Sequence, residues 1–148
     1  PIGEPTALLA GVMVNPAAPD LERELRRFEY KLEAGAEFVV TRPVFDLSAF
    51  ERFMARVRQF SVPIVAGVWA FDSVLNAEFM ANEVPDVAVP AALVERMRRT
   101  TSASAADAEG VEIARELVTR LRALTAGVVV STPGGDVDRA LDVLRSPA

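Results

Sequence analysis

The sequence predicts an α/β protein made of four consecutive parallel strand–helix units. Four short apolar runs have the length of buried strands, at residues 7–14, 38–41, 62–68 and 127–131. A helical pattern follows each run. Because these connections are too long for hairpins, the strands should run parallel with right-handed crossovers. A small doubly wound sheet and four units of a (β/α)8 barrel both satisfy this pattern.

The first two helices have clear start signals. Asp20 is a good N-cap for a helix that ends at Gly35. Its apolar stripe consists of Leu21, Leu25, Phe28 and Leu32. Farther along, Ser48 and Glu51 form an S-x-x-E capping box, which predicts the start of the second helix. The inward face of that helix would consist of Phe50, Phe53, Met54 and Val57.

The middle of the chain predicts a third strand and two short helices. Pro63 fits the beginning of the strand, where a donor to the sheet is not yet needed. Residues 73–100 then predict two helices that are broken at residues 84–86. Pro90 is suited to the first turn of the second helix because it has no N–H to leave unpaired.

The last part of the chain predicts two more helices. The first spans about residues 105–124, with Gly110 as a weak point, and its buried side consists of Ile113, Leu117, Leu121 and Leu124. After the fourth strand, a turn at residues 133–135 leads into the second helix. Its inward residues would be Val137, Ala140, Leu141 and Leu144.

Composition excludes several kinds of chemistry. The 148 residues include no cysteine and no histidine, so zinc fingers, histidine-activated nucleophiles and disulfides are excluded, and we expect no metal site. The net charge of -5 argues against binding to nucleic acids or anionic membranes. No apolar run approaches the roughly 20 residues of a membrane span. We therefore expect residues 1–148 to form a single cytoplasmic domain.

Several blocks of the sequence occur in a characteristic order and spacing. They are GVMVNP at 11–16, KLEAGAEFVVTRPVFD at 31–46, VPIVAGV at 62–68, NAEFMANEVP at 76–85, GVEIA at 110–114 and AL at 140–141. Together they resemble the methylenetetrahydrofolate reductases, most closely the reductase part of bifunctional homocysteine S-methyltransferase/methylenetetrahydrofolate reductases. The resemblance covers residues 7–144. It implies strands five to eight of the family's barrel, and therefore half of a (β/α)8 TIM barrel.

The same resemblance implies a function. It indicates part of a flavin-dependent oxidoreductase of one-carbon metabolism and methionine biosynthesis, which passes hydride from NAD(P)H through FAD to 5,10-methylenetetrahydrofolate. The full-length parent would be the enzyme and this chain alone would be inactive. Half a barrel leaves two sheet edges unpaired, so we expect it to need the missing half-barrel or a second copy. No catalytic residue is assigned.

The resemblance implies that four residues hold the cofactor, namely Asn15, Glu24, Arg27 and Lys31. Lys31 is the only lysine of the chain, and the family has a lysine there that approaches the flavin phosphates. An ammonium group is a suitable point charge for that task. The alternative is an exposed lysine that interacts favourably with the end of its helix, with Glu24 and Arg27 as solvated charges.

Four further residues are implied to face the substrate, namely Arg42, Asn76, Phe79 and Asp136. Arg42 replaces a glutamine that holds the folate ring, and a guanidinium offers no acceptor. We expect a carboxylate beside it, from Asp46 or Asp72. Asp136 replaces an arginine and, as a helix N-cap, argues against a phosphate cradle at residues 132–136. These replacements favour an alternative function, a catalytically degenerate barrel module acting as a binding or scaffold domain. A stand-alone flavodoxin-like sheet is a third possibility.

Overall fold

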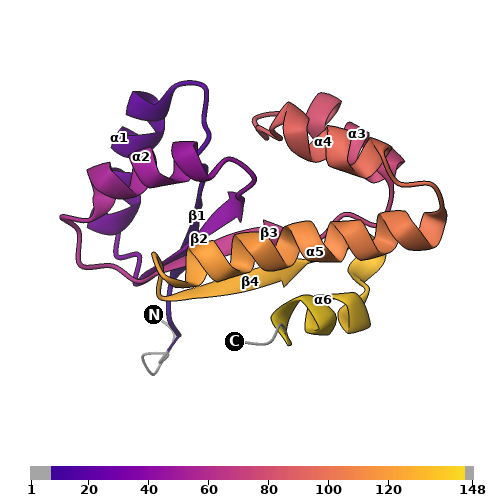
Figure 1. Ribbon diagram of the computed structural model, residues 1–148. Coiled ribbons are helices and arrows are strands. Elements are labelled where there is room, and N and C mark those ends of the chain that lie inside the picture. The colour runs from indigo at the N-terminus through magenta and orange to yellow at the C-terminus, as the bar shows by residue number, and fades with distance from the viewer. Residues whose placement is uncertain (1–7, 146–148) are drawn as a thin grey trace.

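A parallel sheet with strand order β1-β2-β3-β4 organises residues 8–145, which are the residues that the computed structural model describes (Figure 1). The strands are β1 (Gly11–Val14), β2 (Phe38–Pro43), β3 (Ile64–Trp69) and β4 (Gly127–Ser131). The helices are α1 (Leu21–Glu33), α2 (Leu47–Val57), α3 (Val74–Asn82), α4 (Ala91–Arg98), α5 (Ala103–Arg122) and α6 (Val137–Leu144), with a short 3-10 turn at Pro133–Gly135. No helix within this part of the chain is both long and apolar enough to cross a bilayer.

The strand order follows the chain without a reversal. In a doubly wound sheet the order reverses at a switch point, so that helices cover both faces. Here alternate strand residues such as Val39 and Val68 pack against α1, α2 and α5 on one face. This sequential order is consistent with consecutive units of a TIM-barrel-like fold, and it differs from the order of a flavodoxin-like sheet.

The hydrophobic core lies between this face and the helices, in two parts. Beside β1 and β2, the ring of Phe28 on α1 meets Phe53 on α2 edge to face, with 6.0 Å between their centroids. Beside β3 and β4, the rings of Phe45 and Phe71 stack at 5.1 Å, and α5 buries its apolar side. Aromatic pairs of this kind add to the stabilisation that burial provides.

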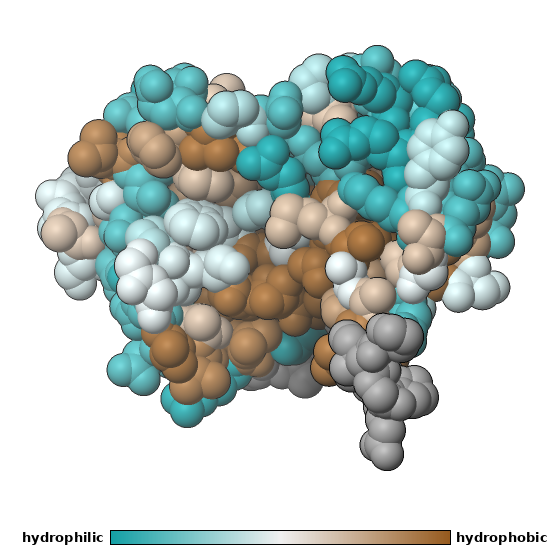
Figure 2. Space-filling model, turned by 180° about the vertical axis from the view of Figure 1, so that it is seen from behind, coloured by the Kyte–Doolittle hydropathy of each residue, from teal (hydrophilic) through white to brown (hydrophobic). Residues whose placement is uncertain are grey.

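The opposite face of the sheet presents apolar side chains, which Figure 2 shows gathered near the centre of the rear view. Val40 and Val65 are register partners at half-buried positions that alternate with core residues. Met13 of β1 and Val129 of β4 are 59% and 41% exposed. The open face thus has the composition of a surface that packs against another layer.

The boundaries of most elements agree with the periodic patterns. Asp20 caps α1 by accepting the N–H of Arg23 at 2.9 Å, and the chain leaves the helix at Gly35 with a φ of 97°. The first strand is shorter than predicted, because it begins at Gly11, and residue 7 lies outside the described residues. The third strand begins just after Pro63.

The predicted capping box at Ser48 and Glu51 is wrong. The N-cap of α2 is Asp46, whose carboxylate accepts the N–H of Ala49 at 3.0 Å. Aspartate is among the strongest N-caps, and its position two residues earlier lets the helix begin at Leu47. Ser48 and Glu51 are consequently ordinary helical residues, and Glu51 lies 3.8 Å from Arg120 of α5.

The inward face predicted for the last helix is wrong at two of its four positions. Val137 and Leu141 are 67% and 37% exposed, Ala140 and Leu144 are half-buried, and Val143 is the buried residue of α6. The reason is that this helix contacts α5 and β4 through the side that contains Val143. Leu124, predicted on the buried side of α5, is 40% exposed because that helix ends at Arg122.

Gly110 is a close-contact position of α5. A Cβ atom built on Gly110 would lie 1.9 Å from the carbonyl oxygen of Phe71, in the segment after β3. Since Gly110 is itself buried, the absence of a side chain lets the helix approach that segment. The predicted weak point is therefore a position where packing requires glycine.

We expect Gly110→Ala to lower the free energy of unfolding by about 2 kcal/mol, because backbone must move to admit the methyl group. Gly127→Ala is the matched control, since a Cβ there meets no atom within 4 Å. That variant should unfold at the wild-type urea concentration or slightly above it. Equal unfolding midpoints for the two variants would contradict this account of the α5 contact.

Candidate functional site

The carboxyl ends of β1 and β2 border a pocket of about 650 Å³. Ligands of parallel α/β proteins bind at this edge of the sheet, where the loops after the strands converge. The lining comes from the end of β1, the loop before α1, one face of α1 from its first to its last turn, the end of β2 and the loop between α3 and α4. Its charged residues are Asp20, Arg23, Glu24, Arg27, Lys31, Arg42 and Asp86.

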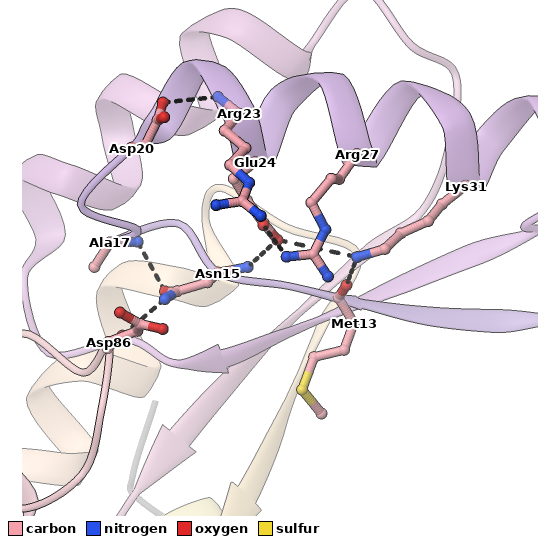
Figure 3. A network of polar contacts seen from close by, with 9 residues as sticks. All are labelled: Met13, Asn15, Ala17, Asp20, Arg23, Glu24, Arg27, Lys31 and Asp86. Atoms are coloured by element: carbon pink, nitrogen blue, oxygen red, sulfur yellow. Dashed lines mark hydrogen bonds and ion pairs between the residues drawn. The ribbon is translucent and has the colours of Figure 1, made fainter.

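The buried carboxylate of Glu24 is the centre of a polar network at this pocket (Figure 3). It accepts the backbone N–H of Asn15 at 3.0 Å. It also lies 3.5 Å from the guanidinium of Arg27 and 4.0 Å from the ammonium of Lys31. Positions i, i+3 and i+7 of a helix share one face, so α1 presents these three residues together. A buried carboxylate is tolerable here because it is paired and hydrogen-bonded.

Lys31 reaches from the last turn of α1 to the backbone of β1. Its ammonium donates a hydrogen bond to the carbonyl oxygen of Met13 at 2.5 Å, and its side chain is 27% exposed. This contact distinguishes it from a freely solvated helix lysine. An ammonium group has three donors, so the contact with Met13 leaves donor capacity on the pocket side.

Asn15 connects the end of β1 to a distant loop. Its Oδ1 accepts the N–H of Ala17 at 3.1 Å, and its Nδ2 donates to the carbonyl oxygen of Asp86 at 2.7 Å. Asp86 has a φ of 58°, in the left-handed region that residues other than glycine rarely adopt. Because both ends of its amide are engaged, Asn15 acts here by positioning the loop between α3 and α4 beside the pocket.

Arg42 lies at the end of β2 and lines the same pocket. It forms no salt bridge with any residue between 8 and 145, so the predicted pairing with Asp46 or Asp72 is wrong. Both carboxylates have local partners instead. Asp46 caps α2, and Asp72 accepts the hydroxyl of Ser73 at 2.7 Å.

The other three predicted substrate residues do not line this pocket. The Oδ1 of Asn76 accepts the indole N–H of Trp69 at 3.0 Å. Phe79 is 53% exposed on α3. Asp136 caps α6 and lies 3.6 Å from the Nε of Arg139, so its carboxylate already has partners. The structure therefore brings together Asn15, Glu24, Arg27, Lys31 and Arg42, and leaves these three outside the pocket.

Three charged pocket residues were not predicted from the sequence as site residues: Asp20, which was predicted only as an N-cap, Arg23 and Asp86. Arg23, Arg27 and Lys31 follow one another at intervals of four, and this helical spacing is a signal that could have identified Arg23. Asp86 had no comparable signal. Its contact with Asn15 joins residues 71 positions apart, which no local pattern indicates.

A second groove, of about 610 Å³, lies between α2, α4 and α5. It is more apolar, with Phe45, Leu47 and Leu93 among its lining residues. None of the eight residues predicted to bind cofactor or substrate borders it. The polar pocket at β1 and β2 is consequently the better candidate site, because polar groups of several elements converge there.

Comparison with known proteins yields one family. A family model described as methylenetetrahydrofolate reductase matches residues 10–131. No curated protein matches the chain. The matched segment contains the four strands and the whole lining of the polar pocket, and it ends before Asp136 and α6.

We expect Glu24→Ala to lower the free energy of unfolding by about 2 kcal/mol, since it leaves the Asn15 N–H without its acceptor and two cations without their carboxylate. Glu24→Gln retains an acceptor and should cost about half as much. Glu29→Ala, at an exposed position of the same helix, is the control and should stay within about 0.5 kcal/mol of the wild type. Chemical denaturation measures all three. A Glu29→Ala variant as unstable as Glu24→Ala would show that the network has no special importance.

Proposed function

Because this chain belongs to the methylenetetrahydrofolate reductase family, we propose that it is part of a flavin-dependent oxidoreductase and holds the phosphate side of FAD at the pocket beside β1 and β2. The network of Asn15, Glu24, Arg27 and Lys31 is the observation that supports this proposal. These residues come from two elements, yet they meet at one pocket.

The residues of the pocket fit an anionic cofactor. Arg27 and Lys31 supply charge-assisted donors of the kind that phosphate groups prefer. Glu24 holds both cations in place, and Asn15 keeps the adjoining loop in position. When bound, FAD would supply hydride transfer between NAD(P)H and methylenetetrahydrofolate. The role of this chain would be to bind and orient the cofactor. That role needs neither cysteine nor histidine.

We further propose that residues 1–148 are one domain, equivalent to strands five to eight of a (β/α)8 barrel. The sequential strand order and the apolar open face support this proposal (Figures 1 and 2). Closure of the barrel would require either another half-barrel or a second copy of the chain. Either one would cover exposed side chains such as Met13 and Val129.

On the substrate side we propose that Arg42 faces the folate, with Asn76, Phe79 and Asp136 nearby at the carboxyl edge of the sheet. Two observations favour a second candidate function. Asp136 is engaged by Arg139, and Arg42 lacks the acceptor that a pterin ring needs. A module that has lost reduction and serves as a binding or scaffold domain is therefore the alternative.

We expect the purified protein to bind FAD, with a change in flavin absorbance and fluorescence on titration. Lys31→Met should weaken binding roughly tenfold, because one charge-assisted contact is lost, whereas Lys31→Arg should retain most of the affinity. Arg99→Gln, at a surface arginine with a 77% exposed side chain, should bind as the wild type does. A protein that stays colourless after FAD is added would exclude cofactor binding by this chain and favour the scaffold function.

We expect Arg42→Gln to strengthen folate binding by roughly tenfold, since an amide provides both a donor and an acceptor to the ring. Trp69 is the only tryptophan, and its fluorescence reports ligand binding at the same edge of the sheet. The Arg99→Gln variant again serves as the control. Unchanged or weaker binding in Arg42→Gln would reject the placement of the folate ring beside residue 42.

A further inference from the structure

We propose that this chain closes its barrel with a second copy of itself, so that β1 of each copy pairs with β4 of the other. The inference rests on the proposed function, in which residues 1–148 are half of a barrel, and goes further by naming the partner and the surfaces that meet. Two copies of the four-stranded sheet supply eight strands, the number at which side chains just fill a barrel interior. A two-fold axis along the barrel makes the two contacts identical.

The first observation is that the two edges of the sheet are complementary. The strand order leaves β1 and β4 as the edges of the sheet within residues 8–145, and every strand pair is parallel. β1 of one copy can therefore continue the sheet beside β4 of the other without a change of direction. The sequences of these strands, GVMV and GVVVS, contain neither a charge nor a proline, which are devices that block an edge.

The backbone of Met13 faces the free edge of β1. Successive residues of a parallel strand direct their N–H and C=O groups to alternate sides. The N–H of Val39 is donated to Pro63, on the β3 side. Val40 therefore points towards β1, and its register partner Met13 points to the free edge. Lys31 occupies one lone pair of the Met13 carbonyl oxygen, and a carbonyl oxygen has two, so the edge keeps an acceptor for a partner strand.

The second observation is an apolar stripe on α6, at the β4 edge (Figure 1). The stripe consists of Val137, Ala140, Leu141 and Leu144. Val137 and Leu141 are 67% and 37% exposed, because the helix turns Val143 to the core instead. The helices of a barrel form a ring in which each one packs between two others. Within residues 8–145 no helix follows α6, and a second copy supplies one, its α1.

The charges beside this stripe favour α1 of a second copy as its neighbour. Both helices follow a strand and begin at the carboxyl edge of the sheet, so their first turns come level when the two sheets join. Arg23 in the first turn of α1 and Asp138 in that of α6 are exposed, and neither forms a salt bridge within residues 8–145. Opposite charges that meet across an interface favour one partner and one register.

Closure of this kind would also complete the polar pocket. The pocket lies beside the end of β1, which is an edge of the sheet in a single copy. Loops that follow neighbouring strands converge at the carboxyl edge of a barrel, so the partner's turn at residues 132–136 would lie beside Asn15. Asp136 does not line the pocket of its own chain, and it would approach the pocket of the other copy.

The oligomeric state of the whole chain tests the proposal, measured by sedimentation velocity over a range of concentrations. The wild type should sediment as a dimer. Leu141→Glu should raise the dissociation constant roughly a hundredfold or more, since the contact would bury a carboxylate without a partner. Leu75→Glu, at a 77% exposed leucine of α3, is the matched control and should leave the dimer intact. Val137→Glu takes over the test if Leu141→Glu does not fold.

Cross-linking identifies the surfaces that meet. The chain contains no cysteine, and Met13 and Val129 are exposed residues of the two edge strands. A mixture of the Met13→Cys and Val129→Cys variants should form a disulfide-linked dimer on mild oxidation, because only β1 and β4 of different copies bring these positions together. Either variant alone should stay unlinked.

Three results would each overturn the inference. They are a monomeric wild type, which would leave closure to another half-barrel, an equal effect of Leu75→Glu and Leu141→Glu, and equal linkage in the mixture and in a single variant. The outcome is separable from that of the FAD titration. If FAD binds to a monomeric chain, the proposed function stands and this inference fails. If the chain dimerises and cross-links as expected without binding FAD, the inference stands and the proposed cofactor binding fails.

Discussion

The constraint on which this structure depends is the parallel pairing of strands in chain order. Each connection then returns on the same side of the sheet, and every strand ends at the same edge. One face of α1 and the end of β2 are brought together in this way, so Lys31 and Arg42 line one pocket although they belong to different elements. The same order explains why one face of the sheet carries the hydrophobic core and the other remains apolar but open.

Within that framework, Glu24 contributes both to stability and to the geometry of the proposed binding site. Its carboxylate satisfies the backbone at the end of β1 and simultaneously fixes two cationic side chains of α1. Lys31 completes the attachment by donating to Met13 on the same strand. A helix that is held to its strand by the groups proposed to bind a ligand has little freedom to reorient them, and such preorganisation favours binding.

Hydrophobic periodicity was sufficient to predict the four strands and the helices, because burial of residues such as Phe28 and Val68 determines which segments are regular. The prediction failed where two residues could each serve as the N-cap of a helix. Asp46 and Ser48 are both suitable N-caps, and the structure uses Asp46, the earlier of the two. It also failed at Val137, because an apolar pattern does not reveal whether a neighbour covers it.

The site residues at the pocket came from the family resemblance. The missing partner of Arg42 and the link from Asn15 to Asp86 are tertiary features without a local signal.

The link from Asn15 to Asp86 has a consequence for the order of events in folding. Its two ends are separated by 71 residues, so the entropy of closing a long loop must be overcome before it can form. During synthesis β1 and α1 emerge well before the loop that follows α3. The pocket is therefore completed only after most of the sheet has assembled, and in a newly made chain the proposed binding site forms late.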